Sequence, residues 1–173
     1  MPCNDGVNWS IEQQLTSDTT FSNTPSIAVS EDYVYVAWED VRDGDFEIYS
    51  KNSTDNGQTW STDLRLTNDS GDSHYPSAAA SGSNIHVTWQ DNRDGNDEIY
   101  YKISNDCGVS WDPDIRLTDD QSISQNATVA VSGEKLHGTI IGFDNFCIQL
   151  KGSTEHLVYK HAIAFITPME HEE

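Results

Sequence analysis

Apolar and polar residues alternate in short runs over the first 130 or so residues of the chain. Runs at residues 26–29, 33–38 and 47–51 are rich in aliphatic and aromatic side chains, which favour β-strands. Turn-forming pairs such as Asp43-Gly44 and Asn56-Gly57 separate the runs, and such pairs are typical of antiparallel hairpins. The pattern predicts several short antiparallel strands separated by tight turns.

The pattern repeats with a period of 51 residues. Trp9, Trp60 and Trp111 share this spacing. The same interval relates Leu15-Thr16 to Leu66-Thr67 and Leu117-Thr118, Pro25-Ser26 to Pro76-Ser77, Trp38 to Trp89, Asp40 to Asp91, Arg42-Asp43-Gly44 to Arg93-Asp94-Gly95, and Ile48-Tyr49 to Ile99-Tyr100. A fixed period with roughly four strands per unit is typical of propeller blades. We predict units at about residues 9–59 and 60–110 and a partial unit at 111–131, with residues 1–125 as the first part of the chain.

Two predicted turns share the form Ser-x-Asp-x-Gly-x-(Thr or Ser)-Trp. This form resembles the Asp box of sialidase-type (BNR) β-propellers, in which the turn is structural. The Asp accepts hydrogen bonds from the turn's own backbone, the Gly takes a positive φ, and the Trp packs between sheets. The resemblance implies a structural role for Ser53, Asp55, Gly57, Trp60, Ser104, Asp106, Gly108 and Trp111.

Acidic side chains gather in the turn that follows the second run of each unit. Such oxygen ligands could hold Ca²⁺, although the spacing is not that of an EF-hand, and a solvated acidic hairpin is the alternative. The weak calcium candidates are Asp40, Asp43, Asp45, Glu47, Asp91, Asp94 and Glu98. Arg42 and Arg93 are similar to the carboxylate-binding arginines of sialidases, but two and a half units cannot close a ring of blades. The sequence predicts no enzyme activity, no catalytic residue and no cofactor beyond this weak calcium site.

The repeat breaks inside its third copy. Val129 still falls on an apolar position of the first two units, but the expected Trp is Ile140 and the expected Asp is Gly142. The following apolar runs, with glycines at bend points, predict short curved strands. These strands are expected at residues 135–143, 146–151, 156–159 and 162–166. We interpret the chain as two unrelated pieces joined within one β-strand.

Three motifs stand close together in the second piece, residues 126–173. They are Gly133-x-x-Leu136-x-Gly138, Phe143-Asp144-x-Phe146, and the run from Val158 to Ile163, which reads Val-Tyr-Lys-His-Ala-Ile. Together they resemble the Sm-like family, and within it Hfq, over roughly forty residues without a gap. The resemblance implies a bent five-stranded barrel and a six-membered ring closed by edge-strand pairing. Residues 126–131 can serve as the first barrel strand, whereas the family's N-terminal helix has no counterpart.

One face of such rings binds U-rich RNA. Carried over by motif, the RNA-binding residues are Asp144, Asn145, Phe146, Tyr159, Lys160 and His161. Phe146 would stack on a base, and Lys160 and His161 would hold a base edge and the backbone. Stacking combined with phosphate neutralisation is the general chemistry of single-strand recognition.

The charge of the chain is unevenly distributed. The formal net charge is −20, and residues 126–173 contain three lysines against six carboxylates, a net of −3, so the first 125 residues carry −17. A block this acidic repels nucleic acid at long range, and the repulsion is strongest at low salt. We therefore expect the first piece to oppose RNA binding by the second.

The cysteines and the N-terminal residues indicate neither a disulfide framework nor secretion. Cys3, Cys107 and Cys147 form an odd set without metal-site spacing, so no disulfide framework is predicted. The first residues do not resemble a signal peptide, and no apolar run approaches membrane length, so we expect a cytoplasmic protein without a membrane partner.

The predicted fold is all-β: an incomplete propeller of about two and a half blades followed by a small Sm-like barrel. The favoured function is binding of single-stranded U-rich RNA by a homo-oligomeric ring, with no DNA partner. One alternative is a propeller scaffold that binds carbohydrate or protein, with the Sm-like segment as an oligomerisation module. The other is a recombinational or artificial chimera with no selected function.

Overall fold

The computed structural model describes residues 11–119, 121–129, 139–143, 147–151 and 155–159, with the last three ranges described by their backbone. Every regular element in these ranges is a β-strand, which confirms the all-β class for this part of the chain. The same ranges contain no helix long and apolar enough to span a membrane.

The first unit folds into one four-stranded antiparallel sheet, called here the first sheet. Its strands are β1 (Ser22–Ser30), β2 (Tyr33–Asp40), β3 (Glu47–Ser53) and β4 (Leu64–Arg65), hydrogen-bonded in chain order. The runs predicted at 26–29, 33–38 and 47–51 lie within β1, β2 and β3, so these strands are confirmed. Alternation along β2 turns Tyr35 and Ala37 to one face and Val36 and Trp38 to the other.

The second unit repeats this arrangement in a second sheet. Its strands are β5 (Ser73–Ser81), β6 (Asn84–Asp91), β7 (Glu98–Ser104) and β8 (Ile115–Arg116), again in chain order. Each strand begins and ends 51 residues after its counterpart in the first sheet. The first strand of both sheets has an irregular register, with positive φ at Thr24 (46°) and Tyr75 (53°). The sequence period is therefore a structural period.

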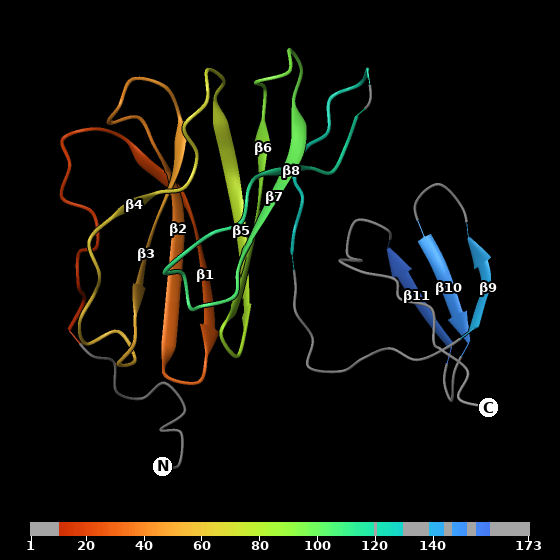
Figure 1. Cartoon of the computed structure of the whole chain (residues 1–173), viewed down its shortest axis with the longest axis horizontal. Coiled ribbons are helices and arrows are strands. Elements are labelled where there is room, and N and C mark those ends of the chain that lie inside the picture. Colours follow the sequence, from red (N-terminus) through yellow and green to blue (C-terminus); the bar gives the residue numbers. More distant parts are fainter. Residues whose placement is uncertain (1–10, 120, 130–138, 144–146, 152–154, 160–173) are drawn as a thin grey trace.

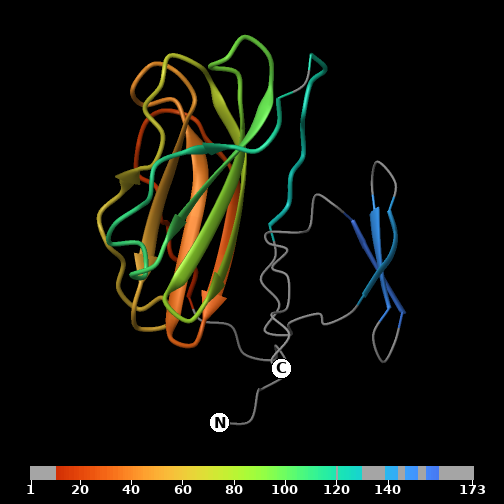
Figure 2. The same ribbon diagram turned by 45° about the vertical axis from the view of Figure 1, so that its right-hand side comes forward.

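The two sheets stack face to face (Figures 1 and 2), with β5 lying against β1 and β2. A core of buried aliphatic and aromatic side chains fills the space between them: Ala28, Tyr35, Ala37, Ile48, Leu66, Ile85, Val87, Trp89 and Tyr100. Two polar contacts fix the alignment, because the Tyr75 amide donates to Glu39 Oε2 (3.1 Å) and the Ala78 amide donates to Ser26 Oγ (3.0 Å). The interface is thus both apolar and specific in register.

A third unit begins in the same way. Residues 121–129, called here the third-unit segment, run along the second sheet in both views (Figures 1 and 2). The Val129 amide donates to Ser77 Oγ at 3.1 Å. Asn126 has a φ of 58° and lies 51 residues after Tyr75. The segment therefore docks on the second sheet as β5 docks on the first.

The described C-terminal strands form a separate three-stranded sheet, called here the C-terminal sheet. It contains β9 (Thr139–Phe143), β10 (Cys147–Lys151) and β11 (Glu155–Tyr159) in the antiparallel order β11-β10-β9. Its register shifts beside Gly142, where Gln149 pairs with Gly142 and Leu150 with Ile140, at a predicted bend point. The strands predicted around 146–151 and 156–159 are confirmed. The predicted strand at 162–166, and the start of the one at 135–143, lie outside the described residues.

Candidate functional site

The first Asp-box turn is closed by its own hydrogen bonds. Asp55 Oδ1 accepts from the Thr59 amide (2.8 Å), and Asp55 Oδ2 accepts from the Thr59 hydroxyl (2.6 Å). Ser53 Oγ donates to Asp55 Oδ1 (2.7 Å) and accepts from the Gly57 amide (2.8 Å). The hydrogen bonds from Thr59, followed by that from Ser53, lower the pKa of Asp55 to about 2. The carboxylate is thus engaged within the turn.

The second turn reproduces the first. Asp106 accepts from the amide (2.8 Å) and the hydroxyl (2.6 Å) of Ser110, and Ser104 Oγ accepts from the Gly108 amide (2.8 Å). Gly57 and Gly108 have φ of 82° and 86°, a region that a glycine adopts without strain. Trp111 packs against the core between the sheets, and Trp60 packs against a second cluster of buried side chains, Val36, Trp38 and Tyr49. These contacts fit the structural role that we predicted for both turns.

The weak calcium candidates have other partners. Asp40 is fully buried, and its Oδ2 accepts from Arg42 (2.8 Å) and from the Trp38 indole (3.0 Å). All of the candidates except the exposed Asp45 are bonded to arginine, tyrosine, threonine, tryptophan or serine groups. Within the described ranges no three His, Cys, Asp or Glu side chains gather as a metal site. The structure therefore gives these carboxylates the role of anchoring cationic and hydroxyl groups.

Both arginines that were compared with the carboxylate-binding arginines of sialidases are already paired. Arg93 contacts three carboxylates, Asp69 at 2.5 Å, Asp91 at 2.6 Å and Asp114 at 2.9 Å. Arg42 has the equivalent partners Asp18, Asp40 and Asp63. Each guanidinium also lies over the ring of a tyrosine, at 4.3 Å and 4.4 Å from its centroid. These arginines neutralise buried acid, so neither is free to bind a substrate carboxylate.

Each arginine and its three carboxylates form an ion network. The sequence interpretation missed two of the three carboxylates in each network. Asp18 and Asp69 are 51 residues apart, as are Asp63 and Asp114. This shared spacing was the available signal, because an acidic residue kept at the same place in two units suggests a fixed partner. Their pairing with an arginine some 20 residues away depends on the fold of the loops.

These networks make the stability of the two stacked sheets dependent on pH. Burial alone would raise the pKa of Asp40 and Asp91, but hydrogen bonds from Arg42 and Arg93 outweigh it and hold both pKa values below the usual range. A depressed carboxyl pKa stabilises the folded state above the unfolded pKa of about 3.9, and this contribution is lost as the pH falls toward the folded value. We expect the urea midpoint to be level between pH 7 and 5 and to fall steadily below about pH 4. An unchanged midpoint at pH 2.5 would contradict the assignment.

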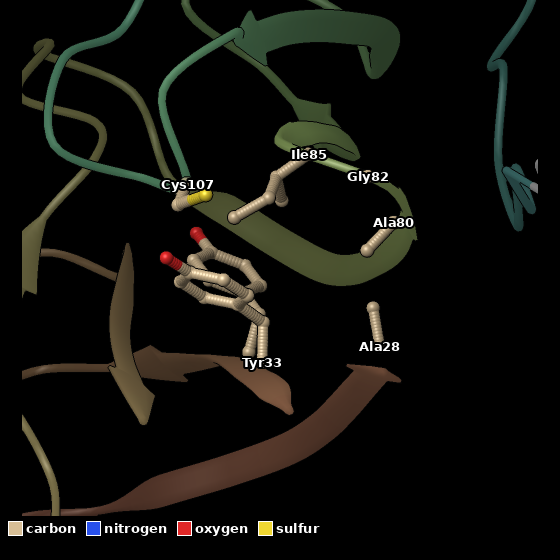
Figure 3. A pocket seen from close by; sticks show the side chains of 7 residues that line it. Ala28, Tyr33, Ala80, Gly82, Ile85 and Cys107 are labelled. Carbon is tan, nitrogen blue, oxygen red and sulfur yellow. The ribbon is translucent and has the colours of Figure 1, made fainter. Parts of the chain in front are cut away.

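The described residues line a small cavity and a larger groove. A cavity of about 10 Å³ between the sheets has room for about one water molecule. Figure 3 shows Cys107, a free thiol, beside tyrosine hydroxyls in this cavity, and a hydrogen bond with Cys107 raises the pKa of Tyr33. A shallow groove on the outer face of the first sheet is lined by Leu15, Thr16, Ser22, Asn23, Pro25, Val36 and Trp38. This outer face of the first sheet is equivalent, 51 residues earlier, to the face of the second sheet that packs on the first.

The C-terminal sheet brings the neighbours of the predicted RNA contacts together. Tyr159, the last residue of β11, pairs with Cys147, the first residue of β10. Phe143, the last residue of β9, pairs with the adjacent Ile148. Of the predicted contacts only Tyr159 is described, whereas Asp144, Asn145, Phe146, Lys160 and His161 lie outside the described residues. In the sequence, each of these five is at most two positions from Phe143, Cys147 or Tyr159.

Comparison with known proteins shows what this part of the chain is similar to. Residues 121–173 match the Hfq protein family. The RNA-binding protein Hfq of Hyphomonas neptunium (strain ATCC 15444) is 55% identical over 40 residues, which is 22% of this chain and 49% of that relative. The chain thus spans about half the length of the curated relative, and the family match covers no residue before 121. Residues 121–173, which follow the 51-residue repeats, are therefore similar to the Hfq family, and we call them the Hfq-like segment.

Proposed function

We propose that the chain binds single-stranded U-rich RNA through a homo-oligomeric ring built from residues 126–173, without catalysing a reaction. The observation that carries the proposal is the Hfq family match, which includes every residue of the Phe143-Asp144-x-Phe146 and Tyr159-Lys160-His161 motifs. Stacking on Phe146 and contacts from Lys160 and His161 would supply the affinity. The sialidase-type propeller remains a prediction for the preceding repeats.

The strand order of the C-terminal sheet is compatible with a ring. β11 has one strand neighbour among the described residues, so its outer edge is open in that part of the chain. In the proposed ring this edge pairs with residues 162–166 of the next subunit, which removes an exposed edge from every subunit. We propose a hexamer, as the family resemblance implies.

The ion networks of the repeats support the expectation that the first 125 residues oppose RNA binding. Arg42 and Arg93 are each surrounded by carboxylates, so they offer no positive charge to a phosphate backbone. The first 125 residues therefore present an acidic surface next to the proposed RNA site in sequence. Salt screens this repulsion, which opposes the usual loss of RNA affinity as salt rises.

Anisotropy of a short labelled oligo-U, titrated with the full chain between about 50 and 500 mM salt, tests the proposal. We expect oligo-U to bind more tightly than a matched oligo-A. We also expect a shallower salt dependence than a basic RNA-binding protein shows, because screening relieves the acidic repulsion. Equal binding of the two oligomers, or no binding at any salt concentration, would refute U-rich recognition by the chain.

A further inference from the structure

We propose that the third-unit segment, residues 121–129, is shared between two mutually exclusive structures. In the first it docks on the second sheet, as observed. In the second it leaves that sheet and supplies the first strand of the Hfq-like segment. Docking is then an autoinhibitory contact that withholds a strand from ring assembly. The inference rests on the proposed ring, but not on what the ring binds.

The docked state is specific, because its contacts are copies of the contacts between the first two sheets. The Val129 amide donates to Ser77 Oγ at 3.1 Å, as the Ala78 amide donates to Ser26 Oγ at 3.0 Å. The Ser124 amide donates to the Asp97 carbonyl at 2.8 Å. The Ser73 amide makes the equivalent bond to the Phe46 carbonyl at 2.7 Å, again 51 residues earlier. The segment thus occupies the place of a third sheet's first strand.

The same residues could instead form a strand of the Hfq-like segment. Its family match begins at residue 121 and therefore includes the whole third-unit segment. Within the described residues β9 is an edge strand with β10 as its single neighbour, so one row of its backbone groups can accept another strand. Residues 126–131 end close in sequence to the start of that strand and have the alternating apolar pattern that it needs.

The two uses compete for the same backbone groups. The Val129 amide donates to Ser77 in the docked state, and an antiparallel ladder with β9 would engage the amides and carbonyls of this segment. The docking is shallow, because Ser124, Ala127 and Val129 are half-buried while the other residues of the segment are exposed. A shallow contact can be released by a modest change in free energy, so the docked fraction controls how many chains are ready to assemble.

A reversible crosslink tests this competition in the full chain. In Ser77→Cys/Val129→Cys, with the three native cysteines replaced by Ser, oxidation joins the two docked positions. The matched control is Ser26→Cys/Ala78→Cys in the same background, which locks the equivalent contact between the first two sheets. We expect the oxidised 77–129 variant to lose at least tenfold of its assembled fraction by light scattering, and reduction to restore it. The oxidised control is expected to assemble as the reduced chain does.

Ser77→Ala tests the same idea in the opposite direction. Removing the hydroxyl acceptor is expected to speed hydrogen exchange of the Val129 amide several-fold and to raise the assembled fraction, whereas Ser26→Ala leaves both unchanged. Equal assembly of the locked and control variants, at whatever mass, would overturn the shared-strand proposal. A lock-dependent change in assembly without oligo-U binding in any state would support the shared strand and refute the proposed RNA function instead.

Discussion

Replacing Asp91 with Ala is expected to lower the free energy of unfolding of the stacked sheets by about 3 kcal/mol, the lower end of the range for breaking a buried ion pair. The side chain of Asp91 is fully buried and accepts hydrogen bonds from the Trp89 indole (2.9 Å), Arg93 (2.6 Å) and Ser73 (2.8 Å). Alanine would leave two buried donors without an acceptor and the guanidinium short of one carboxylate. The lower end applies because Arg93 keeps Asp69 and Asp114.

Urea unfolding followed by tryptophan fluorescence measures this loss in the relevant part of the chain, because all five tryptophans lie between residues 9 and 111. With a slope of about 2 kcal/mol per molar urea, the midpoint should fall by roughly 1.5 M. Asp119→Ala is the matched control, since Asp119 pairs with Arg116 at 2.9 Å but its side chain is 90% exposed. The control should shift stability by less than about 0.5 kcal/mol. Similar losses of unfolding free energy in both variants would mean that the buried Asp91 network stabilises the fold no more than an exposed ion pair does.

The strands of the repeats could be predicted because their signal is local. Alternation in a run such as residues 33–38 fixes which side chains face the core once the run is a strand. The 51-residue period then applies the same assignment to the second unit, and the observed bounds repeat without a shift. The period also predicted a partial third unit at residues 111–131, and the structure adds the contact by which this unit docks on the second sheet, from the Val129 amide to Ser77 Oγ.

The ion networks could not be predicted from the sequence because they join residues that only the folded loops bring together. Arg42 and Asp40 each suggested a ligand, a substrate carboxylate for one and calcium for the other. In the structure they bind each other, and Asp63 reaches Arg42 at 2.7 Å from 21 residues along the chain. Opposite charges close in sequence are therefore as consistent with mutual neutralisation as with a binding site, and the choice depends on burial.

The proposed RNA contacts were inferred through motif resemblance and not through geometry. The residue types in the run from Tyr159 to His161 do not by themselves indicate a binding site, since a lysine and a histidine are common at strand ends. The backbone adds that the chain leaves β9 and β11, and enters β10, at one end of the same sheet. That convergence makes a joint site for the two motifs physically reasonable, and it leads to a test with an internal control.

Lys160→Ala and His161→Ala are each expected to weaken oligo-U binding by about 1–3 kcal/mol, roughly 5- to 150-fold, the scale of one lost base or phosphate contact. Lys151→Ala is the matched control, because it removes the same charge from the opposite end of the C-terminal sheet, where Lys151 pairs with Glu155 and Thr139. If Lys160 neutralises a phosphate, its removal should also reduce the salt slope by about one. Equal losses for Lys151→Ala and Lys160→Ala would instead indicate a nonspecific charge effect, and would remove Lys160 from the site.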